Sequence, residues 1–232
     1  MPTPRTLAAT AAYVALAATD TVLAGRTDRV ARRARFLVKP LLMPALAVAF
    51  HEGTRAGDDP MLRRTAAAQA FSWGGDVALL GRGEKAFLAG VGSFFAAHVA
   101  YVAGFASARA PAPTGPARGG VKAAAALWVA AGPAMAVAAG RRSPRLAAPV
   151  AAYAGVLATM FGASTALDPA MPRRARTTVR AGTTLFLVSD TLLGVQDFLL
   201  TEPHPALERA VMATYTAGQG LIAWGVAQGL DR

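Results

Sequence analysis

The chain of 232 residues contains no cysteine and only three histidines. The absence of cysteine excludes disulfide bonds, thiolate catalysis and cysteine-based metal sites. The histidines, His51, His98 and His204, lie far apart and do not form the His-Glu-x-x-His pattern of zinc hydrolases, which argues against a zinc site. A serine hydrolase is also disfavoured, because the stretch closest to Gly-x-Ser-x-Gly, from Gly162 to Ala166, lacks the final glycine.

Charged residues are scarce, and they fall between long apolar runs. They make up 16% of the chain against 54% hydrophobic residues, and the mean hydropathy is +0.37. This pattern is typical of a polytopic membrane protein. The formal net charge of +11 comes mainly from arginines between the apolar runs, without a basic stripe of interleaved aromatics. We therefore expect membrane lipid headgroups, and no nucleic acid, as partners of these arginines.

Charged residues, proline and glycine divide the chain into eight apolar segments, each near the ~20 residues that cross a bilayer. The sequence thus predicts an all-α, polytopic integral membrane bundle of about eight transmembrane helices, forming a single domain over residues 1–232. Residues 108–119 and 168–177, rich in proline or arginine, are predicted to be exposed loops. The predicted spans are 6–25, 35–51, 62–80, 86–107, 120–139, 145–167, 178–200 and 206–229.

An even number of spans places both chain ends on the same side of the membrane. The arginines clustered between the first two spans favour the cytoplasm for that loop. We expect the protein to be a multi-pass component of the cell membrane.

Asp76 and Asp190 are the residues that point most directly to function, because each lies within a predicted transmembrane segment. A carboxylate at bilayer depth costs about 2.5–3.5 kcal/mol on insertion scales, so such residues normally face the bundle interior and serve a purpose there. Two of them predict a polar site inside the membrane.

Further polar residues share the depth of these aspartates. Measured from the face of the first loop at ~1.5 Å per residue, the two aspartates and four further polar residues all fall in the same half of the bilayer. This arrangement predicts one cavity that opens at that face. The six residues are Asp20, Lys39, Asp76, His98, Asp190 and Tyr215.

Helical spacing adds neighbours on the same faces. Ser72 lies one turn before Asp76, Tyr101 follows His98, and Gln219 follows Tyr215. Structural roles remain alternatives for several of these side chains. Ser72 and Gln219 could join helices by hydrogen bonds, and His98 could be a packing residue. Lys39 could reach the lipid headgroups or pair with Asp20.

An ordered set of motifs runs from about residue 36 to residue 225. It is similar to the set found in the YhhN-like lysoplasmalogenase family. The motifs are Lys39-Pro40-Leu41, Phe71-Ser72-x-x-Gly75-Asp76, Phe87-x-x-Gly90-x-x-x-Phe94-x-x-x-His98-x-x-Tyr101, Gly182-x-x-x-Phe186-x-x-Ser189-Asp190 and Tyr215-x-x-x-Gln219.

The resemblance implies an eight-helix membrane enzyme that hydrolyses the vinyl ether bond of lysoplasmalogens. Its lysophospholipid substrate would yield a fatty aldehyde and a glycerophospho-ethanolamine or glycerophospho-choline. The resemblance points to Asp76 and Asp190 as the catalytic pair, and we expect the deeper Asp190 to act as acid and Asp76 as base. No metal or organic cofactor is expected. The substrate-binding residues are predicted to be Asp20, Lys39, Ser72, His98, Tyr101, Ser189, Tyr215 and Gln219.

A different class of protein remains as the alternative. A proton-coupled transporter or a lipid-binding membrane protein could use the same intramembrane acids. Such a transporter often carries an inverted repeat with a matched pair of broken helices. No such repeat is evident here, since Pro40 and Pro44 interrupt only one of the predicted spans.

Overall fold

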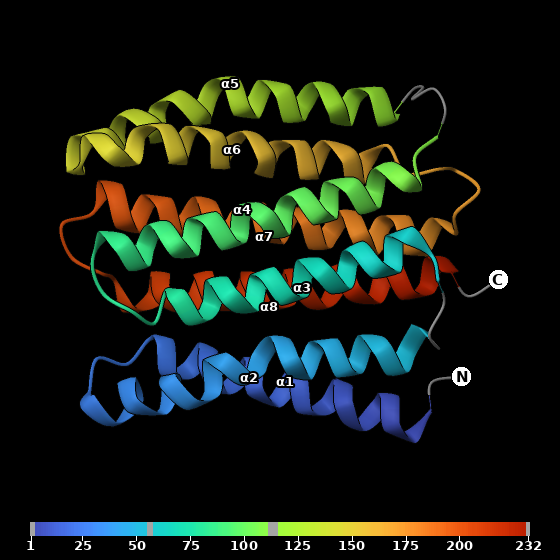
Figure 1. Cartoon of the computed structure of the whole chain (residues 1–232), viewed down its shortest axis with the longest axis horizontal. Coiled ribbons are helices and arrows are strands. Elements are labelled where there is room, and N and C mark those ends of the chain that lie inside the picture. Colours follow the sequence, from blue (N-terminus) through green and yellow to red (C-terminus); the bar gives the residue numbers. More distant parts are fainter. Residues whose placement is uncertain (1–2, 55–57, 111–115, 231–232) are drawn as a thin grey trace.

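The computed structural model describes residues 3–54, 58–110 and 116–230, which form eight α-helices and no strand (Figure 1). The all-α class and the eight predicted segments are thereby confirmed. The helices are α1 (Pro4–Ala24), α2 (Arg29–Thr54), α3 (Pro60–Ala78), α4 (Glu84–Ser107), α5 (Pro116–Arg142), α6 (Pro144–Thr165), α7 (Arg173–Leu199) and α8 (Pro205–Leu230).

Several helices begin earlier than hydropathy predicted. Residues 173–177, predicted to be loop, form the first turns of α7, and α5 begins at Pro116 inside the predicted loop 108–119. Residues 111–115 of that loop lie outside the described residues. The early start of α5 has a local cause, because the ring of Pro116 suits the first helical turn, where the missing N–H has no intrahelical partner.

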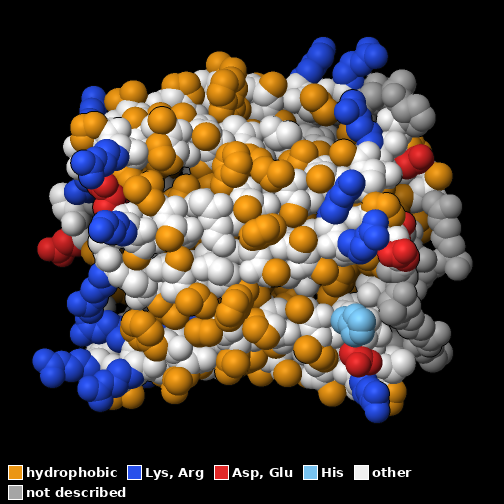
Figure 2. All heavy atoms as spheres, in the orientation of Figure 1, with side chains coloured by type: hydrophobic (Ala, Val, Ile, Leu, Met, Phe, Trp, Pro, Cys, Tyr) orange, Lys and Arg blue, Asp and Glu red, His pale blue; other side chains and the backbone are white. Residues whose placement is uncertain are grey.

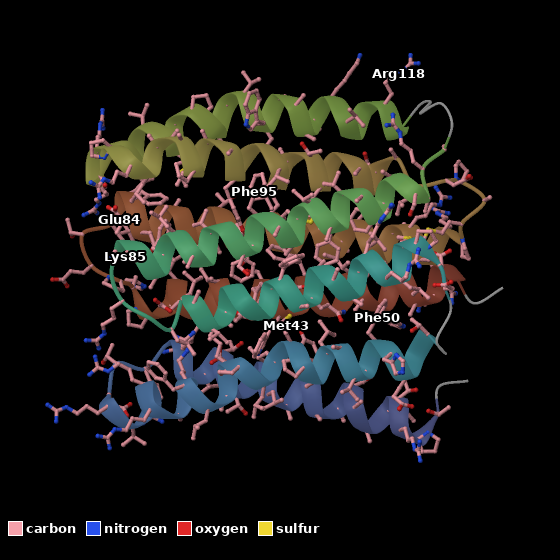
Figure 3. All side chains as sticks on the ribbon, viewed as in Figure 1. Met43, Phe50, Glu84, Lys85, Phe95 and Arg118 are labelled. Carbon is pink, nitrogen blue, oxygen red and sulfur yellow. The ribbon has the colours of Figure 1, made fainter. Side chains whose placement is uncertain are left out.

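The exposed surface between the two ends of the bundle is apolar, as expected for a membrane protein. Charged side chains gather at the ends of the face seen in Figure 2, with a mainly apolar band between them. Figure 3 places Glu84 and Lys85 at one end and Arg118 at the other. Large apolar side chains such as Val14, Val48 and Trp224 are exposed along the helices. Lipid is the environment that such a surface requires.

On length and composition alone, five of the eight helices could cross a membrane: α1, α2, α4, α5 and α6. Helices α3, α7 and α8 carry many of the buried polar side chains, which lower their hydropathy. They nevertheless pack inside the same bundle, α7 against α8 and α3 against α4 (Figure 1). Their polarity therefore marks an interior site rather than an aqueous location.

Helices α7 and α8 approach each other closely through glycine. A Cβ atom on Gly218 would lie 2.9 Å from the carbonyl oxygen of Gly182, which is too close for any side chain. Small residues of this kind allow helix backbones to touch, and close packing is a main source of helix association in lipid. This contact sets the position of Asp190 on α7 relative to Tyr215 on α8.

By contrast, α4 and α7 are held apart by aromatic side chains. No Cα atom of α4 comes within 8 Å of one in α7 over their described lengths. The rings of Phe94 and His98 from α4 meet Phe186 of α7 edge to face, with centroids 6.5 and 4.8 Å apart. These large spacers leave room between the helices for cavities.

Two prolines inside α2 are accommodated by a contact from α3. Pro44 has no N–H group, so the carbonyl oxygen of Pro40, four residues earlier, has no intrahelical donor. The indole nitrogen of Trp73 donates a hydrogen bond of 3.0 Å to this oxygen. In lipid such a carbonyl must find a protein partner. The bond therefore joins α2 to α3 next to Lys39.

Candidate active site

A cavity of about 570 Å³ lies between α2, α3, α4, α6, α7 and α8, and both Asp76 and Asp190 line it. Residues of the α3–α4 and α5–α6 connections, Gly83 and Ser143, also line it. The cavity is therefore at the end of the bundle that carries the α1–α2 loop, the end predicted from the depths of the polar residues. Its charged lining residues are Arg35, Lys39, Asp76, Glu84, Arg142, Asp190, Asp197 and Glu208.

Asp76 is held in the wall of this cavity by two partners. Its Oδ1 lies 3.5 Å from the Nζ atom of Lys39, and its Oδ2 accepts a hydrogen bond of 2.8 Å from the hydroxyl of Tyr215. The side chain of Asp76 is only 1% exposed. A cation and a hydroxyl donor both stabilise the ionised carboxylate. This environment suits a base or a group that stabilises positive charge.

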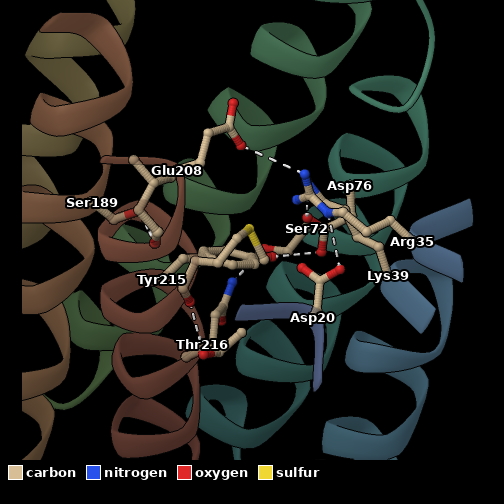
Figure 4. A network of polar contacts seen from close by, with 12 residues as sticks. Asp20, Arg35, Lys39, Ser72, Asp76, Ser189, Glu208, Tyr215 and Thr216 are labelled. Carbon is tan, nitrogen blue, oxygen red and sulfur yellow. Dashed lines mark hydrogen bonds and ion pairs between the residues drawn. The ribbon is translucent and has the colours of Figure 1, made fainter. Parts of the chain in front are cut away.

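Arg35 connects three helices at the mouth of the cavity (Figure 4). Its guanidinium lies 3.2 Å from Asp20 of α1 and 3.5 Å from Glu208 of α8. The suggested pairing of Asp20 with Lys39 is therefore wrong, because Asp20 forms an ion pair with Arg35 and Lys39 forms one with Asp76. Lys39 is also buried, so it does not extend to the headgroups. Asp20 holds Arg35 in place instead of lining the cavity itself.

Asp190 has neutral partners. The hydroxyl of Tyr153, on α6, donates a hydrogen bond to Oδ2 of Asp190, and Nε2 of His98 lies 3.8 Å from the same oxygen. Nδ1 of His98 contacts the carbonyl oxygen of Phe94, which can only accept, so this nitrogen carries the hydrogen. A neutral His98 ring then presents its Nε2 lone pair to Asp190. No Lys or Arg pairs with Asp190 in the described part of the chain.

Tyr153 was missed by sequence reasoning. It is a single aromatic residue in an alanine-rich stretch of α6, without a polar neighbour at helical spacing. A tyrosine in such a place often needs a hydrogen-bond partner when buried, which was the available signal. Only the fold, however, brings α6 against α7 and identifies Asp190 as that partner.

Three predicted substrate-binding residues lie behind the cavity. Tyr101 donates to Oε1 of Gln219 at 2.6 Å, and Nε2 of Gln219 donates to Ser72 at 2.9 Å. All three are fully buried, and none is among the cavity-lining residues of the described chain. They join α3, α4 and α8 beneath Asp76, and their contact with substrate stays a prediction.

His98 and Ser189 were also predicted to bind substrate. His98 is fully buried, and its Nε2 atom lies 3.8 Å from Asp190 rather than on the cavity surface. Ser189 lines the cavity, but its hydroxyl donates 3.0 Å to the carbonyl oxygen of Val211. Of the predicted substrate-binding residues, Lys39, Ser189 and Tyr215 line the cavity.

An apolar pocket of about 160 Å³ adjoins the charged cavity. Side chains of α4, α5, α6 and α7 line it, and most of them are hydrocarbon or aromatic. Asp190 and Tyr153 line both spaces. The Asp190 carboxyl group therefore lies where a charged cavity meets an apolar pocket. Within the described ranges, no three His, Asp or Glu side chains are grouped so that they could hold a metal ion.

Comparison with known proteins identifies the chain through its family. Searches of curated proteins and of solved structures found no similar protein. The model of the YhhN family matches residues 34–226, which include every motif quoted above. Because this match covers most of the sequence, the chain belongs to the YhhN family.

Proposed function

We propose that this protein hydrolyses the vinyl ether bond of lysoplasmalogens and releases a fatty aldehyde and a glycerophospho-alcohol. Membership of the YhhN family supports a lysoplasmalogenase-type hydrolase. The observation that carries the proposal is the position of Asp190 at the border between the charged cavity and the apolar pocket. In a lysoplasmalogen, the vinyl ether likewise lies between the polar glycerophospho group and the hydrocarbon chain.

The reaction begins with transfer of a proton to the outer carbon of the double bond. The carbon bonded to oxygen then carries the positive charge of an oxocarbenium ion. Water adds to that carbon and loses a proton to a carboxylate. The product of this addition is a hemiacetal. The bond to the glycerol oxygen then breaks, and that oxygen takes the proton which the second carboxylate had accepted from water. The hemiacetal hydroxyl gives its proton to the carboxylate that donated in the first step, so the aldehyde forms and both carboxyl groups return to their starting states. A proton-donating carboxyl and an ionised carboxylate suit this sequence, as they do in glycosidases.

The environments of the two aspartates support a division of roles. Asp76, beside Lys39 and Tyr215, is suited to remain ionised, to stabilise the oxocarbenium ion and to accept the proton of water. Asp190 has no Lys or Arg partner in the described chain, and its hydrogen bond from Tyr153 uses only Oδ2. Asp190 is therefore the proposed acid, with Oδ1 as the donating atom.

The charged mouth of the cavity suits the phosphate of the substrate. Arg35 and Lys39 already pair with acids, whereas Arg142 donates to the backbone carbonyl oxygens of Phe198 and Leu200. Arg142 thus keeps a positive charge available at the cavity, and a guanidinium binds phosphate oxygens well. We assign phosphate binding to Arg142, which lines the same cavity as Arg35, rather than to Lys39.

The proposal is tested by measuring aldehyde release from lysoplasmalogen by the detergent-purified protein. Asp76→Asn and Asp190→Asn should each lower turnover by about 10²–10⁴-fold, the usual contribution of general acid–base catalysis. Asp58→Asn is the matched control, because the Asp58 side chain is 93% exposed in a loop. Near-normal turnover in either variant would exclude that aspartate from catalysis.

The alternative class has a distinct outcome in the same material. If the folded wild-type protein releases no aldehyde but moves protons or lysolipid across vesicles, the intramembrane acids serve transport. Aldehyde release that depends on both aspartates would instead exclude a transporter as the primary function.

A further inference from the structure

We propose that Trp128 on α5 closes the far end of the apolar pocket and so limits the length of hydrocarbon chain that the protein accepts. This inference rests on the proposed function, since it assigns the apolar pocket beside Asp190 to the alkenyl chain of the substrate. It adds a binding site for the alkenyl chain and names the residue that limits how long that alkenyl chain can be.

Three cavities follow one another along the bundle axis. The charged cavity lies at the end with the α1–α2 loop, the apolar pocket comes next, and a third cavity of about 550 Å³ lies farther along α4, α5 and α6. Residue order on α6 supports this sequence of cavities. Leu146 lines the charged cavity, Val150 and Ala154 line the apolar pocket, and Gly162 and Ala166 at the other end of the helix line the third cavity.

Trp128 lies at the border between the apolar pocket and the third cavity. It lines both spaces, and the only other residue that does so in the described chain is Ala158 of α6. Ala158 is small, so the indole ring of Trp128 is the main obstacle between them. A chain that extends from Asp190 along the pocket would reach this ring.

One side of the indole lies against two glycines, while 44% of Trp128 remains exposed. A Cβ atom on Gly132 would lie 3.1 Å from the indole of Trp128, and one on Gly155 of α6 would lie 3.2 Å from its Nε1 atom. The ring therefore packs over bare backbone on its own helix and on α6. These contacts on one side favour the ring position at the border of the two spaces, where a limit on chain length would act.

The chemistry of the pocket suits a hydrocarbon chain rather than another ligand. Its walls away from Asp190 are formed by side chains such as Leu127, Met135, Val150 and Leu157. These groups offer dispersion contacts and few hydrogen bonds, so they favour methylene groups over polar ones. One methylene that cannot be accommodated costs roughly 10-fold or more in kcat/KM in such a pocket.

The test compares chain-length profiles of Trp128→Ala and the wild type. With lysoplasmalogens of increasing chain length, the wild-type kcat/KM should fall beyond a limiting length. Trp128→Ala should raise kcat/KM for the longer chains at least roughly tenfold and leave the shorter chains little changed. Trp224→Ala is the control, because Trp224 is 60% exposed on α8 and lines none of the three cavities. An unchanged profile in folded Trp128→Ala would overturn the proposal.

A second variant shifts the limit in the opposite direction. Ala131 lines the apolar pocket without being fully buried, so Ala131→Leu should fill part of it and move the limit to shorter chains. If Trp128→Ala does not fold, Ala131→Leu still tests whether the apolar pocket holds the hydrocarbon chain. A profile for Ala131→Leu identical to that of the wild type would contradict assignment of the pocket to the chain.

Binding measurements separate this inference from the proposed reaction. Saturated alkyl-ether lysophosphocholines of the same lengths lack the double bond and are not hydrolysed by this chemistry. If their Kd values depend on length and shift in Trp128→Ala while no vinyl ether is cleaved, the reaction is wrong and the chain site stands. If aldehyde is released but neither kcat/KM nor Kd responds to Trp128, the reaction stands and the length limit is wrong.

Discussion

Replacing Lys39 by methionine should destabilise the folded protein, and adding Asp76→Asn should recover most of the loss. Lys39 Nζ lies 3.5 Å from Asp76 Oδ1, and the two side chains are 10% and 1% exposed. Without Lys39, the carboxylate would remain in the interior with only the Tyr215 hydroxyl as partner. Breaking a buried pair by removing one partner costs about 3–5 kcal/mol, whereas replacing both partners by neutral groups is often close to neutral.

For a chain of this size, 1 kcal/mol corresponds to about 2–4 °C in melting temperature, so Lys39→Met should lower it by roughly 6–20 °C. The assay is thermal unfolding in detergent micelles of the wild type, both single variants and the double variant. Lys85→Met serves as the control, because Lys85 is exposed at the end of α4 (Figure 3) and should change the melting temperature little.

Additive effects of the two substitutions would refute this reasoning, because coupled residues must show an interaction energy. A phosphate-binding role for Lys39 predicts a different result. In that case Lys39→Met would leave the melting temperature unchanged and raise KM for lysoplasmalogen much more than for a neutral alkenyl glycerol.

Three further predictions concern the hydrogen-bond partners of polar side chains and use the same unfolding assay. Trp73→Phe should cost about 1 kcal/mol, because the carbonyl oxygen of Pro40 loses its donor; no change would mean that another group replaces the indole. Gln219→Leu should cost about 1–3 kcal/mol, because it leaves the buried Tyr101 hydroxyl without its acceptor. Gln69→Leu should be neutral or stabilising, since neither amide atom of the buried Gln69 has a hydrogen-bond partner in the described chain. Equal losses in the two glutamine variants would contradict this distinction.

The sequence by itself determined the fold class, the family and the positions of the two aspartates. Apolar runs of membrane-spanning length are local features, so eight helices could be predicted without knowing how they pack. The aspartates could be identified for a similar reason, because the cost of a carboxylate at bilayer depth depends on its position along its own helix. The ordered motifs then pointed to the YhhN family, which the match over residues 34–226 confirms.

Local sequence predicted the number of helices, but it did not predict where each helix begins and ends. The apolar run of a predicted span ends where charged residues begin, yet the arginine-rich start of α7 is helical from Arg173. Arginine is a good helix former, and its charge excludes only the hydrocarbon region, not the helix. The helical pattern and the membrane pattern therefore end at different residues.

The partners of each polar residue were decided only by the tertiary structure. Lys39 pairs with Asp76 rather than Asp20, and Tyr153 rather than a predicted residue binds Asp190. Such choices depend on how each helix is rotated about its axis and how near its neighbours lie. Those quantities follow from contacts between distant segments, such as Gly182 against Gly218, which no periodicity within a single helix encodes.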